Sequence, residues 1–66
     1  MQVKEVDYMG IIADHVANLK HSGGYISWIQ FDMNADYPLA IVFTDAGGNR
    51  HNLEYNRRGY ERTLEV

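Results

Sequence analysis

The chain contains no cysteine and only one proline among its 66 residues. Without cysteine, neither a disulfide nor a thiolate zinc site can stabilise the fold. A domain of this length buries only about 60% of its unfolded surface, so its stability depends on packing and would gain from contact with a second copy. The single proline and the hydrophobic fraction of 45% predict an ordered globule rather than a disordered segment.

Long apolar runs and a basic surplus are also absent. No stretch approaches the roughly 20 apolar residues that span a membrane. The N-terminal region carries Glu5 and Asp7, whereas a signal peptide is basic and then apolar. The net charge of −3 lacks the surplus with which a general nucleic-acid binder neutralises phosphates. We therefore expect a cytoplasmic protein that does not contact membranes.

A continuous apolar run does occur at residues 39–44, between Pro38 and turn-forming residues at 45–49. Successive side chains of a strand point to opposite faces. Both faces of this run are apolar, with Leu39, Ile41 and Phe43 on one and Ala40 and Val42 on the other. The run predicts a central strand at about 39–45 that is at least partly covered on both faces.

An amphipathic helix is predicted at about residues 6–21, because apolar residues recur there at three- and four-residue spacing. Glu5 and Asp7 lie at its start, where negative charge complements the helix dipole, and the pair at 23–24 is a glycine stop. We expect the sheet-facing side to include Val6, Met9, Ile12, Ala13, Val16 and Leu19.

Two further strands are predicted at about 25–33 and 49–55 from their aromatic, β-branched and alternating residues. The second has the pattern of a half-solvated edge strand. In the first, we expect one set of side chains to face the helix, namely Tyr25, Ser27, Ile29, Phe31 and Met33. The opposite set is Ile26, Trp28, Gln30 and Asp32.

The tail at residues 56–66 favours a fourth strand after a turn at 58–59, over a short helix or a loose end. We therefore predict a single α+β domain over 1–66, with an N-terminal helix packed on a three- to four-stranded antiparallel meander.

No set of residues matches a catalytic, metal or phosphate-binding signature. His15 and His21 are six residues apart, whereas metal-binding pairs on a helix are three or four apart, and His51 belongs to a different element. No serine or threonine lies in a nucleophile motif. We expect neither enzymatic activity nor a metal or cofactor.

One candidate interface lies on the sheet face away from the helix, since a single helix covers only one face. The predicted interface residues are Ile26, Trp28 and Val42. Trp is the residue type most enriched at interface hot spots, and the surface would serve a homodimer or another protein. The alternative is that the tail folds back and covers this face with Leu64 and Val66, and both possibilities remain open.

The second candidate is a basic and aromatic cluster in the C-terminal third, formed by Arg50, His51, Arg57, Arg58 and Arg62. Such a cluster suits phosphates and stacked bases. The interspersed Glu54, Glu61 and Glu65 would repel a phosphate backbone, and this favours pairing with acidic groups of a protein partner.

Taken together, these features predict a small non-enzymatic protein-binding module. We expect it to be an inhibitor or adaptor of a larger protein complex in a bacterium, phage or mobile element. The alternative is a nucleic-acid-binding protein that uses the arginine-rich C-terminal third.

Overall fold

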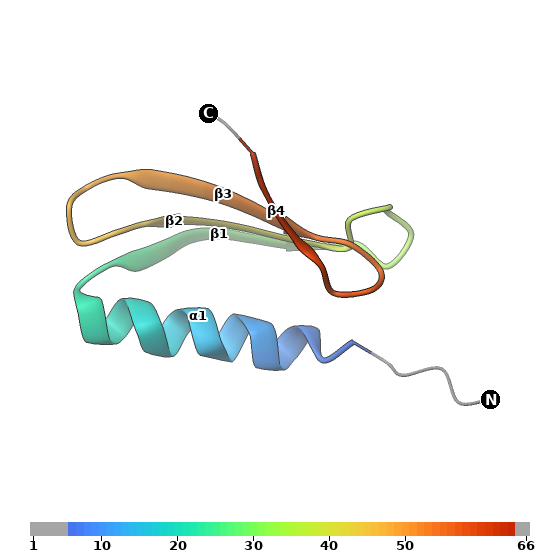
Figure 1. Cartoon of the computed structure of the whole chain (residues 1–66), viewed down its shortest axis with the longest axis horizontal. Coiled ribbons are helices and arrows are strands. Elements are labelled where there is room, and N and C mark those ends of the chain that lie inside the picture. Colours follow the sequence, from blue (N-terminus) through green and yellow to red (C-terminus); the bar gives the residue numbers. More distant parts are fainter. Residues whose placement is uncertain (1–5, 65–66) are drawn as a thin grey trace.

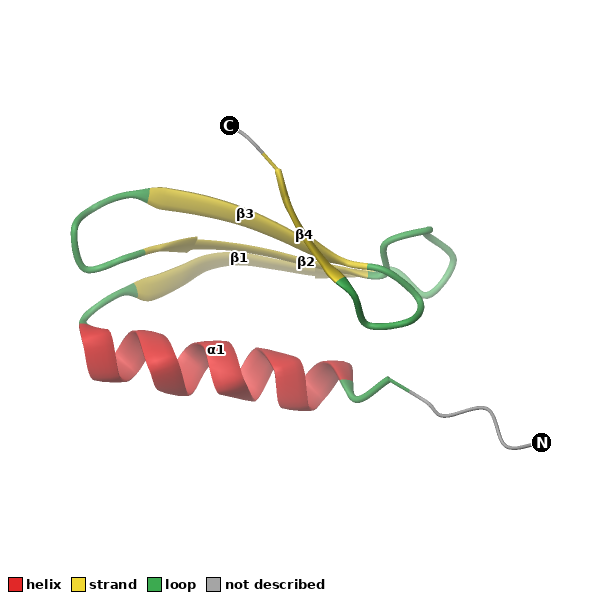
Figure 2. Ribbon diagram, in the orientation of Figure 1, coloured by secondary structure: helices red, strands yellow, loops and turns green. Residues whose placement is uncertain are grey.

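A computed structural model describes residues 6–64, which form one helix on a four-stranded antiparallel sheet (Figure 1). The elements are α1 (Tyr8–Ser22), β1 (Tyr25–Phe31), β2 (Leu39–Thr44), β3 (Arg50–Tyr55) and β4 (Glu61–Leu64). The strand order is β1-β2-β3-β4, so each strand pairs with its neighbour in the chain. Figure 2 shows α1 lying along one face of this sheet. The predicted α+β fold is confirmed.

Local chemistry sets the two ends of α1. The Asp7 carboxylate caps the first turn by accepting a hydrogen bond from the Gly10 N–H at 2.9 Å. At the other end Gly23 has φ 98°, and its N–H donates to the Leu19 carbonyl at 2.8 Å. A Cβ on Gly24 would lie 2.5 Å from the Thr44 carbonyl oxygen, so glycine lets the chain pass directly into β1. Glu5, also expected near the helix start, lies outside the described residues.

The sheet-facing side of α1 differs from the predicted one. Met9 is 75% exposed and Val16 is 47% exposed, and Ala13 is exposed as well, so their predicted packing on the sheet is wrong. The side that meets the sheet consists of Tyr8, Ile11, Ile12, His15 and Leu19.

Two amphipathic residues explain this rotation of the helix. The Tyr8 hydroxyl donates to the Asn56 carbonyl at 2.7 Å, and His15 Nε2 lies 2.6 Å from the Tyr55 hydroxyl. Their rings therefore pack inward while their polar atoms find partners on the sheet. The sequence prediction counted tyrosine and histidine as polar. It therefore chose the adjacent side of the helix, which carries Met9, Ala13 and Val16.

The core lies between α1 and the two inner strands. Leu39 and Ile41 on β2 are fully buried, and Leu53 and Tyr55 on β3 are each 6% exposed. The predicted edge position of β3 is wrong, because β4 pairs along its outer side. Within residues 6–64, no helix is long and apolar enough to cross a membrane.

An irregularity in the pairing of β1 places its first residues on faces other than the predicted ones. Ile26 pairs with Phe43 and Trp28 pairs with Val42, which leaves Ser27 as an extra residue in a β-bulge. The bulge turns Ile26 towards the helix and leaves Trp28 on the other face.

Beyond the bulge, Ile29 and Phe31 point towards the helix side as predicted, and the Phe31 ring lies 5.3 Å from the Tyr8 ring. Met33 follows β1 in a turn and is 65% exposed.

The tail extends the sheet. β4 runs antiparallel to β3 after a turn in which Gly59 has φ 83°, and Leu64 lies opposite Asn52. The described tail therefore adds an edge strand instead of folding back over the sheet. Val66, the second residue proposed to cover the sheet, lies outside the described residues.

Candidate protein-binding surface

The face of the sheet opposite α1, here called the open face, carries two rows of side chains that cross all four strands. Cross-strand partners share a face, so the registers define each row. The first row is Trp28, Val42, Asn52 and Leu64, and the second is Gln30, Ala40, Glu54 and Arg62.

The first row is largely apolar and accessible. Trp28 is 57% exposed and Leu64 is 36% exposed, with the half-buried Val42 and Asn52 between them. Tyr25, which the bulge leaves on the same face, is 62% exposed. Two of the three predicted interface residues, Trp28 and Val42, are thus neighbours on the open face.

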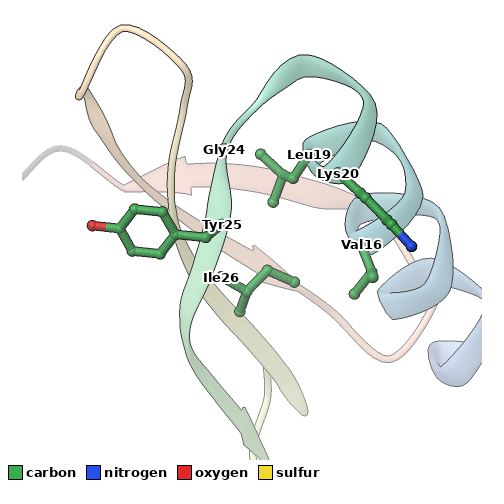
Figure 3. Close-up of a pocket in the computed structure, with 6 residues that line it drawn as sticks. All are labelled: Val16, Leu19, Lys20, Gly24, Tyr25 and Ile26. Carbon is green, nitrogen blue, oxygen red and sulfur yellow. The ribbon is translucent and has the colours of Figure 1, made fainter.

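The third predicted residue does not belong to this surface. Ile26 packs against the buried core cluster on the helix side, and Figure 3 shows its side chain turned towards α1 while Tyr25 points away. The prediction that Ile26 shares a face with Trp28 is wrong, because it assumed unbroken alternation through Ser27.

A charged pair in the second row borders the apolar row. Nε and Nη2 of Arg62 both donate to Glu54 Oε1, at 3.0 and 2.7 Å. The guanidinium carbon also lies 3.6 Å from the centre of the Tyr37 ring, in a cation–π contact. The hydrogen bonds to Glu54 raise the pKa of Arg62. Its positive charge is therefore already balanced within the chain.

The structure does not gather the predicted basic cluster at one site. Arg50 and His51 begin β3, whereas Arg57 and Arg58 follow its end, and a six-residue strand spans about 20 Å. Nη2 of Arg57 donates to the Met33 carbonyl at 3.0 Å, which ties the β3–β4 turn to the β1–β2 loop. Together with the pairing of Arg62, this separation leaves no continuous basic stripe over the described strands.

His51 belongs to a turn-stabilising group on the helix side. Its ring stacks on Phe43 with 4.7 Å between centroids, and its Nε2 lies 2.8 Å from Asp45 Oδ2. The backbone N–H groups of Gly47 and Asn49 donate to Asp45 Oδ1, each at 2.9 Å. The hydrogen bond from His51 and these backbone donors lower the pKa of Asp45 to about 2.

A second polar group, which sequence reasoning missed, links α1, β3 and β4. The Tyr55 hydroxyl donates to Glu61 Oε2 at 2.8 Å, so His15 Nε2 must be the donor in its 2.6 Å contact with the same oxygen. Burial and the Glu61 carboxylate raise the pKa of Tyr55. The pairing of Tyr55 with Glu61 across β3 and β4 could be found only with the register of the fourth strand.

These two groups are small and contain few ligating side chains. Among residues 6–64, no three or more His, Asp or Glu side chains gather as a metal site would require. A shallow groove of about 320 Å³ lies between α1 and β1 and is mostly apolar (Figure 3). Its lining residues are Val16, Leu19, Lys20, Gly24, Tyr25 and Ile26.

Comparison with known protein-family models finds no match, and searches among curated proteins and solved structures find no significant match to this chain. The arguments about function therefore depend on the geometry of the surface.

Proposed function

We propose that this protein is a non-enzymatic protein-binding module that docks onto a larger protein through its open face. The observation that carries the proposal is Trp28, which is 57% exposed in a row with Val42 and Leu64. Grouped apolar side chains on a surface mark interaction sites, and a tryptophan in such a group is the residue type that most often anchors an interface.

The surroundings of Trp28 have the composition of a protein interface. An apolar centre is bordered by polar groups, here Gln30 and the Glu54–Arg62 pair, which remain hydrated when the centre is desolvated. Removing an anchoring tryptophan from such a centre typically costs about 2–4 kcal/mol of binding free energy. Trp28 is therefore the residue on which the affinity should depend most.

Charge supports a protein partner over the alternative of a nucleic acid. Arg62 is neutralised by Glu54, and Arg50 lies at the opposite end of β3 from Arg57 and Arg58. Phosphate recognition needs several unpaired cations in a continuous line on the surface. Glu54 lies on β3 between Arg50 and Arg57, so its negative charge would interrupt such a line.

A chain of this size that offers a surface and few chemical groups would act by occupying a site on another molecule. We propose that it serves as an inhibitor or adaptor of a larger complex in the cytoplasm of a bacterium, or in a cell that carries a phage or mobile element. The acidic composition of these residues supports this assignment.

Site-specific photo-cross-linking in the native cell tests the proposal. A photoreactive leucine analogue replaces Leu64 on the open face, and the control carries the same analogue at the exposed Ala17 on the outer side of α1. We expect a nuclease-resistant adduct with a larger protein from position 64 and none from position 17. Equal adducts from both positions, or adducts that nuclease removes, would contradict the proposal.

A further inference from the structure

We propose that β4 is a detachable strap, which opens away from β3 as a unit while α1 and the other three strands stay folded. Only the closed strap completes the open face, because β4 supplies Leu64 to its first row and Arg62 to its second. The opening is a property of the chain alone. Its consequence, that the docking surface is complete only when the strap is closed, rests on the proposed function.

β4 contributes nothing to the core. All four of its residues are exposed, and the one apolar residue among them, Leu64, is 36% exposed. The buried core cluster belongs to β2 and β3, and the partly buried side chains packed against it come from α1, β1 and β2. Segments with few buried apolar contacts open locally at a lower free energy than the whole domain unfolds. Opening of β4 would therefore leave the core in place.

Polar side-chain contacts hold β4 on both faces of the sheet. On the helix side, Glu61 Oε2 accepts the 2.8 Å hydrogen bond of the Tyr55 hydroxyl. On the open face, Arg62 donates to Glu54 and lies 3.6 Å from the centre of the Tyr37 ring. Exposed pairs of this kind are individually weak, because water solvates the separated groups and salt screens their attraction. These contacts favour the closed strap without making it permanent.

The β3–β4 turn provides a hinge. Its first half is anchored, because the Asn56 carbonyl accepts the 2.7 Å hydrogen bond of the Tyr8 hydroxyl on α1. Nη2 of Arg57 also donates to the Met33 carbonyl in the β1–β2 loop, at 3.0 Å. Gly59 follows these anchors with φ 83°, a conformation that glycine adopts without strain. The opening should therefore begin after Arg57, in the segment that contains Gly59.

The pairing of the strands identifies the amides that report the opening. The Asn56 N–H donates to the Tyr60 carbonyl at 3.0 Å, and hydrogen-bonding residues alternate along an antiparallel strand. Glu54 therefore directs its N–H towards β4, whereas its neighbours Leu53 and Tyr55 direct theirs towards β2. Adjacent amides of one strand thus report separately on its two edges.

Native-state hydrogen exchange in low concentrations of urea tests the proposal. We expect the Glu54 amide to be protected at least about tenfold less than those of Leu53 and Tyr55, because local opening is enough to expose it. Its protection should be nearly independent of urea, since the release of a four-residue strand exposes little surface. The protection of Leu53 and Tyr55 should fall steeply with urea, because their exchange requires unfolding of the core.

Two variants separate the strap from the core. Ile41→Val loosens the core in the closed and open forms alike, so it should lower the protection of Leu53 about fivefold and leave that of Glu54 unchanged. Arg62→Gln weakens only the closed form, so it should lower the protection of both amides by the same factor, about threefold. The matched control, Arg50→Gln at the other end of β3, should change neither.

Equal protection and equal urea dependence at Glu54, Leu53 and Tyr55 would overturn the proposal, because β4 would then open only with the whole domain. A loss of protection in Ile41→Val as large at Glu54 as at Leu53 would overturn it as well. Both measurements use the protein alone. The cross-link expected from position 64 is a separate observation, so failure of the strap and failure of the proposed function can be distinguished.

Discussion

The two faces of the sheet use the same strands for different purposes. On the helix side, β2 and β3 contribute Leu39, Ile41, Leu53 and Tyr55, which are all buried. On the open face the intervening residues of the same strands are half-buried, and β1 adds the exposed Trp28. The contrast indicates that alternate residues of one strand divide between stabilising the fold and presenting a surface.

This contrast can be tested residue by residue. Substitutions on the helix side should lower the free energy of unfolding with little specific effect on binding. Substitutions on the open face should weaken binding with a smaller effect on the free energy of unfolding.

The largest effect is expected from Ile41→Ala, because Ile41 is fully buried in the core cluster. Truncating a buried isoleucine costs about 2–5 kcal/mol, which approaches the total stability of a domain of this size. The variant should be largely unfolded by circular dichroism at 37 °C. Val42→Ala, one residue along on the open face, is the control and should still melt cooperatively. Equal losses from both variants would mean that the open face is also part of the core.

A smaller loss is expected from Tyr55→Phe. The ring would remain in the core, but the hydrogen bonds of the hydroxyl to His15 and Glu61 would be lost. Each net hydrogen bond contributes about 1 kcal/mol, and urea denaturation measures the difference. Tyr60→Phe, at a tyrosine that is 67% exposed, should change the midpoint little. If Tyr60→Phe were the more damaging of the two, the proposed link between α1, β3 and β4 would be wrong.

A still smaller effect is expected at acid pH. The pKa of Asp45 is lowered from 3.8 to about 2, chiefly by its hydrogen bond with His51. A depressed pKa in the folded state means that the carboxylate contributes stability above pH 3.8, and that this contribution is lost as the pH falls to about 2. Asp45→Asn keeps an acceptor for the turn but removes the charge, so the stabilities of parent and variant should converge over this interval.

Denaturation curves at pH 5, 3.5 and 2 would measure the convergence, with Asp36→Asn in an exposed turn as the control. A difference between parent and Asp45→Asn that stays constant over this range would show that the carboxylate charge does not stabilise the turn.

Much of the architecture could be predicted because it depends on local patterns. Apolar spacing indicated the helix, Gly23 marked its end, and the unbroken run of β2 identified the strand that now carries Leu39 and Ile41 at the centre of the core. The faces of α1 and of the first part of β1 could not be predicted. The helix face depends on distant partners for Tyr8 and His15, and the bulge at Ser27 has no signature in the residue types.

The candidate surface, too, could be predicted only in part. Trp28 and Val42 fall together because regular alternation holds on β2 and resumes on β1 after the bulge. Ile26 was assigned to that surface only because the bulge was not visible. Arg50 is separated from Arg57 and Arg58 by the length of β3. The sequence prediction grouped these residues because they are close in the sequence, and it did not take the length of the strand into account.

The central claim, that the open face recognises another protein, is tested most directly by Trp28→Ala. Because Trp28 is 57% exposed and lies outside the core cluster, the substitution should destabilise the fold less than Ile41→Ala does and should leave the variant folded. The same substitution should abolish the nuclease-resistant cross-link formed from position 64. Retention of that cross-link in a folded Trp28→Ala variant would contradict the account.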